Sequence, residues 1–187
     1  MKVAPIHLLL IFTLFSCTPD PAKQVRTYEK AHNDHDVNKV MSLYTDDIIF
    51  EITGSWRKSG RDQVHGLAEW DSVTGSNMII SDIVEGKDTV RFRLKEKNDW
   101  FRAIGIEYMY YDPCIMVFSG GLIKELKATV TEESSEAFRV RWPLVYQWLS
   151  MEKEPDMTRL IANGEFVYNA ENANKWLLLL KEWQLRR

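Results

Sequence analysis

Residues 41–51 read MSLYTDDIIFE, and this stretch decides the fold. An apolar stripe at helical spacing leads into it, made by Val37, Val40, Met41 and Tyr44. Asp36 stands before the stripe, where its carboxylate can cap a helix. Asp46-Asp47 then opens an apolar run, and we expect a strand over Ile48–Thr53. The stretch therefore predicts a short capped helix that passes directly into a strand.

The flanking segments extend this order of elements. Upstream, Val25, Tyr28 and His32 share one face at i, i+3 and i+7, which predicts a helix. Residues 33–36 (NDHD) are rich in turn formers and predict a break after it. Downstream, residues 54–60 form a polar loop that contains Trp56, and residues 61–73 suggest a third helix. The N-terminal third is thus expected to run helix, helix, strand, helix.

The middle of the chain is predicted to be a β-meander. Strands are expected over 78–85 and 89–96, joined by a turn at residues 85–88. Alternation of Val90, Phe92 and Leu94 with basic residues indicates one buried and one solvated face. A strand over 107–119, disturbed at Asp112-Pro113, suggests a bulge or an edge, and 122–130 returns after Gly120-Gly121.

Helical patterns return after Thr131, where two glutamates favour a helix start. Pro143 is expected to break or kink this helix. A second helix is predicted from Pro155 to Gly164, and a third from about Ala170 to the end. Together these patterns give an α+β fold class: a sheet wrapped on N-terminal helices, with a C-terminal helical extension.

The composition bounds the function. The 187 residues carry a formal net charge of −3, and 45% of them are apolar, which suits one globular domain with an appendage. No basic excess exists to neutralise phosphates, so we expect no nucleic-acid partner. Aromatic residues reach 12%, with seven Trp and seven Tyr, which suit a core or a ligand cavity.

The first residues indicate an envelope lipoprotein. Residues 1–16 join a lysine to a short apolar run, as in a signal peptide, and are too short to span a membrane. The sequence Leu14-Phe15-Ser16-Cys17 resembles a bacterial lipobox, which implies a lipid, palmitate among its acyl chains, on Cys17. Residues 17–21 then form a tether. We expect a protein anchored to a bacterial envelope membrane, with Cys114 an inert strand thiol.

The pattern as a whole resembles the nuclear transport factor 2-like superfamily, in its SnoaL-like branch. The resemblance is carried by Tyr28–Asn33, Asp36-Val37, residues 41–51 and Gly60-Arg61. It covers about residues 22–131 and leaves residues 132–187 as the C-terminal extension. It implies a cone, in which a curved antiparallel sheet wraps around helices and leaves an apolar pocket at its open end.

Steroid-isomerase-like members of this superfamily imply site residues. Tyr28 matches their hydrogen-bond-donating tyrosine, but Ile52 occupies the position of their general base. An alkyl side chain cannot accept a proton, so that chemistry is predicted to be absent. The predicted pocket residues are Tyr28, His32, Ile52, Trp56, Trp70, Tyr108 and Tyr110.

Three functions remain open from the sequence. The first is binding of a small apolar or amphipathic molecule without catalysis. The second is a lyase, isomerase or hydrolase that uses Tyr28 with His32 or a sheet carboxylate. The third is an interaction scaffold, or a homodimer, through the sheet face. No cofactor is expected, and no metal either, because His32 and His35 have no third ligand nearby in sequence.

Overall fold

The computed structural model describes residues 20–186, so the predicted signal segment and Cys17 lie outside the described residues. A six-stranded sheet has the order β2-β1-β6-β5-β4-β3. Its strands are β1 (Tyr44–Ile52), β2 (Trp56–Ser59), β3 (Asn77–Glu85), β4 (Thr89–Lys97), β5 (Met109–Ser119) and β6 (Leu122–Val130). Neighbouring strands are antiparallel except β1 and β6, which are parallel.

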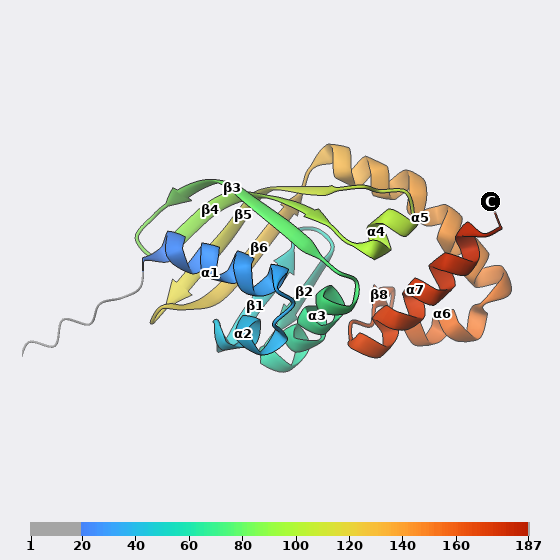
Figure 1. Ribbon diagram of the computed structural model, residues 1–187, viewed down its shortest axis with the longest axis horizontal. Helices are drawn as coiled ribbons and strands as arrows, with labels where there is room; N and C mark the ends of the chain where they lie inside the picture. Colours follow the sequence, from blue (N-terminus) through green and yellow to red (C-terminus); the bar gives the residue numbers. More distant parts are fainter. Residues whose placement is uncertain (1–19, 187) are drawn as a thin grey trace, which may run out of the picture.

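Four helices accompany the sheet, and Figure 1 shows α1 lying across it. They are α1 (Pro21–Asn33), α2 (Val37–Ser42), α3 (Arg61–Val73) and α4 (Asp99–Ala103). Asp20 caps α1 by accepting a hydrogen bond from the Ala22 amide at 3.0 Å, and Asp36 caps α2 through the Lys39 amide at 2.9 Å. The predicted break at residues 33–36 is therefore confirmed.

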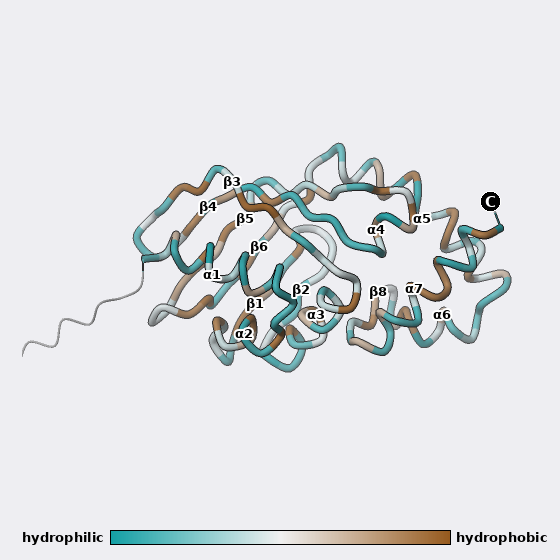
Figure 2. The backbone as a smooth tube through the Cα atoms, in the orientation of Figure 1, coloured by the Kyte–Doolittle hydropathy of each residue, from teal (hydrophilic) through white to brown (hydrophobic). Residues whose placement is uncertain are grey.

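Local register shifts disturb the sheet where Asp112-Pro113 interrupts β5. The pairing of β5 shifts between Tyr111 and Cys114, and that of β4 between Phe92 and Leu94. Such bulges bend a strand and increase its twist. Figure 2 shows hydrophobic and hydrophilic segments following one another along the strands, as expected for a sheet with one buried face.

Side chains of α1 occupy the open edge of β3. The Asn33 amide group donates to the Met78 carbonyl and accepts from the Met78 amide, both at 2.8 Å. One turn earlier, the Glu29 carboxylate accepts from the Ile80 amide at 2.7 Å, and Arg26 donates to the Ile80 carbonyl at 2.8 Å. The backbone groups of this edge are thus paired by a helix instead of by another strand.

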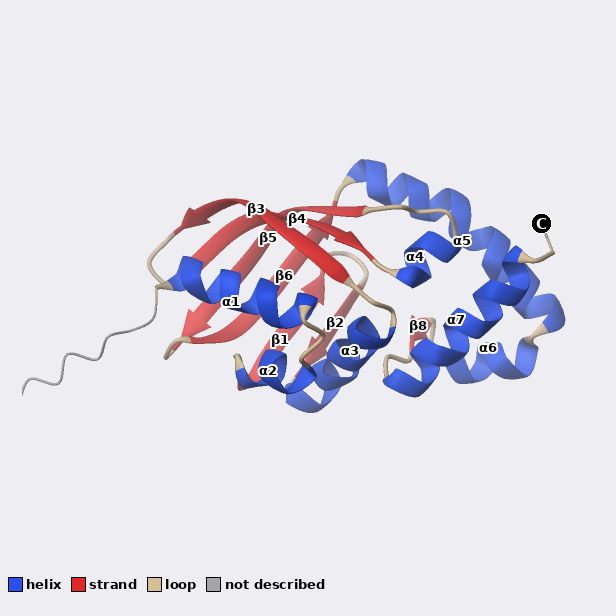
Figure 3. Cartoon of the chain, viewed as in Figure 1, coloured by secondary structure: helices blue, strands red, loops and turns tan. Residues whose placement is uncertain are grey.

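The C-terminal extension gathers at one end of the sheet, where Figure 3 shows a group of helices. It contains α5 (Glu132–Glu152), α6 (Glu154–Leu160), a small hairpin of β7 (Ile161–Ala162) and β8 (Glu165–Phe166), and α7 (Ala170–Gln184). Helix α7 packs against α3 and α4. Within residues 20–186, no helix is both long and apolar enough to cross a membrane.

Two local predictions need correction. Helix α5 continues through Pro143, so the break does not occur, and a kink was the other outcome expected there. Pro143 is exposed, so water can reach the carbonyl group that loses its helical partner. Residues 56–59, predicted as loop, form β2 because they pair with the end of β1. The α+β fold class itself is confirmed, with a curved sheet, N-terminal helices and C-terminal helices.

Candidate functional site

A cavity of about 880 Å³ lies between the sheet and the C-terminal extension. The strands β1, β4 and β5 and helix α3 supply one part of its wall, and α5 and the segment 157–168 supply the other. The extension thus takes part in forming the cavity. This volume is within the range of small-molecule sites, which run from about 300 to 1,000 Å³.

Aromatic side chains dominate the wall. Those that meet one another across the two parts are Trp56, Trp70, Trp100, Phe138, Trp142, Phe166 and Tyr168. The ring centroids of Trp70 and Tyr168 are 5.1 Å apart, with the planes at 79°. Trp100 and Phe166 lie 5.4 Å apart at 76°. Aromatic pairs favour such edge-to-face arrangements, so these contacts hold the extension against the sheet as well as line the cavity.

Glu96 of β4 is the carboxyl group at the polar side of the cavity. Its Oε1 accepts hydrogen bonds from Ser76 at 2.8 Å and from the Asn98 amide group at 3.0 Å. Its Oε2 accepts from the Tyr111 hydroxyl at 3.2 Å. Burial raises the pKa of Glu96 and the charge of Asp71 raises it further, against the opposing effect of His32 and the hydrogen bonds from Ser76 and Asn98.

Asp71 of α3 lines the same cavity and is held by His32 of α1. The His32 Nε2 lies 3.3 Å from the Asp71 Oδ2, and its Nδ1 lies 3.4 Å from the Asn33 Oδ1. Burial lowers the pKa of His32, but the hydrogen bond and charge of Asp71 outweigh it and leave the pKa raised. An oxygen lies beside each ring nitrogen of His32, and only the imidazolium form has an N–H group to donate to both of them.

Tyr28 lies behind this pair and outside the large cavity. Its ring centroid is 6.1 Å from that of His32 and 6.0 Å from that of Tyr44. These side chains border a hollow of only about 10 Å³, which Asp71 separates from the large cavity. Burial raises the pKa of Tyr28 well above its ordinary value. Tyr28 therefore packs beside His32 and does not line the large cavity.

The structure divides the other predicted pocket residues into two groups. Ile52, Trp56 and Trp70 line the cavity. Tyr108 and Tyr110 do not, because alternation along the chain turns Met109 and Tyr111 toward the cavity instead. The ring of Tyr108 lies under the Lys95 ammonium, 3.6 Å from its centroid.

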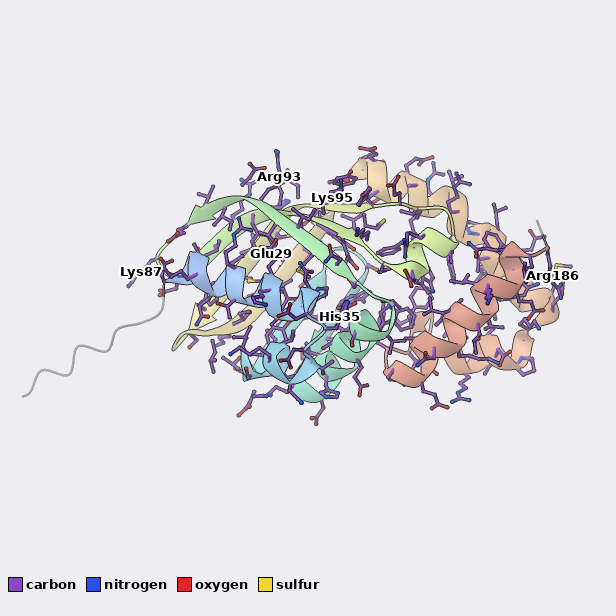
Figure 4. The ribbon with its side chains drawn as sticks, viewed as in Figure 1. Glu29, His35, Lys87, Arg93, Lys95 and Arg186 are labelled. Atoms are coloured by element: carbon purple, nitrogen blue, oxygen red, sulfur yellow. The ribbon has the colours of Figure 1, made fainter. Side chains whose placement is uncertain are left out.

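The outer face of the sheet is charged. Figure 4 labels Arg93 and Lys95 on β4, on the other side of the sheet from Glu29 of α1. Arg93 forms ion pairs with Asp112 at 2.8 Å and with Asp82 at 3.3 Å. Exposed apolar side chains share this face, because Ile79 pairs with Lys95 and Val84 pairs with Arg91, so an interaction through the sheet face stays a prediction.

Sequence reasoning missed Glu96 and Tyr111. The alternation of Val90, Phe92 and Leu94 continues to Glu96, so a carboxyl group at the end of an apolar stripe was the available signal. Trp142 of the C-terminal extension also lines the cavity, together with Trp56, Trp70 and Trp100. Apolar spacing along a sequence shows that a helix has a buried face, but it does not show which cavity that face borders.

The described residues offer no metal cluster and one inert thiol. In residues 20–186 no group of three or more His, Cys, Asp or Glu side chains is placed to hold a metal ion. Cys114 is fully buried, and burial raises the pKa of its thiol to about 12. The expectation of a buried strand thiol is confirmed.

Comparison with known proteins places the fold. No protein-family model and no curated protein matches the chain. Among solved structures, the epoxide hydrolase/cyclase-like enzyme SalBIII aligns with a TM-score of 0.54 at 14% identity, over 60% of this chain and 92% of that one. An M. tuberculosis LEH-like epoxide hydrolase aligns at 0.51 and 14%, over 66% and 92%.

A third solved structure gives the fold its name. An NTF2-like protein of unknown function from Cytophaga hutchinsonii aligns with a TM-score of 0.51 at 8% identity, over 63% of this chain and 95% of that one. Each alignment spans nearly the whole of the other protein and about two thirds of this one. The curved sheet with its N-terminal helices, extended here by α5–α7, is the NTF2-like fold.

Proposed function

We propose that the protein binds a small apolar or amphipathic molecule in the cavity between the sheet and the C-terminal extension. The observation that carries this proposal is the cavity of about 880 Å³ with aromatic walls and a few carboxyl and amide groups at one side.

A filling variant tests the proposal. Val130 lines the cavity, and Val117, which alternates with the buried Met116 and Phe118, belongs to the other face of the sheet. In a thermal-shift screen of aromatic and terpenoid compounds, we expect hits that stabilise the parent and Val117→Trp but no longer stabilise Val130→Trp. Absence of any hit, or hits that bind Val130→Trp equally well, would refute binding in this cavity.

An acid–base enzyme is the second candidate, favoured by Asp71 and Glu96 on one cavity. A carboxyl group with a raised pKa can act as an acid, and a carboxylate held by His32 can act as a base. In hydrolysis of an epoxide, water attacks a ring carbon and gives its proton to Asp71. The C–O bond breaks, and Glu96 protonates the leaving oxygen. Solved structures with this fold include epoxide hydrolases, which supports testing this chemistry first.

Conversion of an aromatic epoxide to its diol tests the second candidate. We expect Asp71→Asn and Glu96→Gln each to lower kcat by at least 10²-fold, the usual contribution of acid–base groups. Glu165→Gln, at the mouth of the same cavity, serves as the matched control. Equal activity in all three variants would refute the assignment, and no activity in the parent would leave binding as the function.

We further propose that the protein is anchored to a bacterial envelope membrane by lipid on Cys17. The support is the short apolar segment before Leu14-Phe15-Ser16-Cys17. Radiolabelled palmitate should enter the parent and Cys114→Ala, but not Cys17→Ala, during expression in bacteria. Equal labelling of Cys17→Ala would exclude the anchor.

A further inference from the structure

The charged groups that line the cavity share one sign. They are Asp71, Glu96 and Glu165, and none of the described residues that line the cavity is Lys, Arg or His. Glu165 stands at the exposed end, where Lys58 forms an ion pair with it. Asp71 and Glu96 belong to the inner polar side. A cavity with this charge distribution attracts cations and repels anions.

The two inner carboxyl groups are not fully compensated by the protein. His32 is the cation beside them, and it contacts Asp71 from the side away from the cavity. Glu96 receives hydrogen bonds only from neutral groups, Ser76, Asn98 and Tyr111. Like charges that share a site disfavour each other's ionised form. A further positive charge beside Glu96 would stabilise the ionised form of both carboxyl groups.

The aromatic wall suits the same kind of ligand. Trp56, Trp70 and Tyr168 form a corner, with ring centroids 5.8 Å apart for Trp56 and Tyr168 and 5.1 Å apart for Trp70 and Tyr168. The two pairs of ring planes meet at 54° and 79°. Ring faces carry negative electrostatic potential, and aromatic cages of angled rings are the usual protein sites for quaternary ammonium groups.

We infer that the ligand is an organic cation, an apolar molecule with one ammonium or quaternary ammonium group that lies beside Asp71 and Glu96. This inference rests on the proposed binding function and names its ligand class. The apolar body of the molecule contacts the tryptophan-rich wall, while its charge supplies the cation that the cavity lacks.

Three probes of nearly the same size separate charge from shape. They are benzyltrimethylammonium, its uncharged carbon isostere neopentylbenzene, and the anion phenylacetate. Binding to the purified chain from residue 18 onward is measured by ligand-observed NMR at constant ionic strength and pH 7.5. We expect the cation to bind at least tenfold more tightly than the isostere, and phenylacetate to bind least.

Variants identify the groups responsible. Glu96→Gln and Asp71→Asn should each weaken benzyltrimethylammonium at least fivefold and leave neopentylbenzene within twofold of the parent, which also shows that the cavity is intact. Equal binding of cation and isostere, or tighter binding of phenylacetate, overturns the cation inference and leaves the binding function standing. If no probe binds the parent, the proposed binding function is overturned together with this inference.

Discussion

Gly66 of α3 lies directly against the backbone of Tyr168 in the C-terminal extension. A Cβ atom added there would lie 2.3 Å from the Tyr168 carbonyl oxygen and 3.2 Å from its carbon. Ordinary carbon–oxygen contacts are about 3.3 Å or longer, so the segment at Tyr168 would have to move by about 1 Å. The obstacle is backbone, which yields less easily than a flexible side chain.

Two opposing effects set the magnitude for Gly66→Ala. Alanine in place of glycine inside a helix stabilises by about 1 kcal/mol. Forcing extra volume into a packed site costs about 1–3 kcal/mol, and a rigid backbone obstacle favours the upper end. We therefore expect a net loss of about 2 kcal/mol in the free energy of unfolding. For a chain of this size, that corresponds to a fall in Tm of about 4–8 °C.

Thermal and urea unfolding followed by circular dichroism measure this effect. His65 is exposed on the same helix, so His65→Ala and His65→Gly give the alanine-over-glycine difference without the obstacle. His65→Ala should be more stable than His65→Gly by about 1 kcal/mol. At position 66 the order should reverse, with the parent glycine more stable than Gly66→Ala. A Gly66→Ala protein as stable as its parent would show that the Tyr168 segment is not held against α3.

Three further outcomes follow from the same structure. Burial and the charge of Asp71 raise the pKa of Glu96 in the folded state, so the protonated side chain stabilises the fold fully below its unfolded pKa of about 4.3, and this contribution is lost as the pH rises through the folded pKa. Glu96→Gln should therefore gain stability relative to the parent as the pH rises above about 4.3, and a constant difference between the two proteins would contradict this. Asn33→Ala removes both hydrogen bonds to Met78 and should cost about 2 kcal/mol in urea unfolding, against no change if water replaces them. Cys114 should react with a thiol reagent only at the rate of unfolding, since it is fully buried with its pKa raised to about 12; rapid labelling of the folded protein would disagree.

Local signals predicted the elements well, because each depends on nearby residues. Asp36 before an apolar stripe gave the capped helix α2, and Thr131 before two glutamates gave the start of α5, where its hydroxyl accepts from the Ser134 amide. Asp112-Pro113 indicated the bulge in β5. In each case the residue that sets the backbone lies within the element or directly before it.

The missed features depend on contacts between distant residues. Strand β2 is polar and short, and it exists only because β1 offers it a partner. Glu96 could be placed on the inner face by alternation, but its role depends on Asp71 and Tyr111 from other elements. The wall that Trp142 and Tyr168 supply depends on how the extension docks, for which the sequence holds no local pattern.

The side chains of α1 that pair with β3 have a consequence for association between molecules. An unpaired edge strand is a template on which another chain can add a strand. Here Asn33 and Glu29 occupy backbone groups of Met78 and Ile80 that an incoming strand would need. At the opposite edge, β2 has only four residues. One edge strand of the sheet is therefore covered by α1 and the other is short. Neighbouring copies of the protein would find few free backbone groups with which to extend the sheet from one molecule to the next.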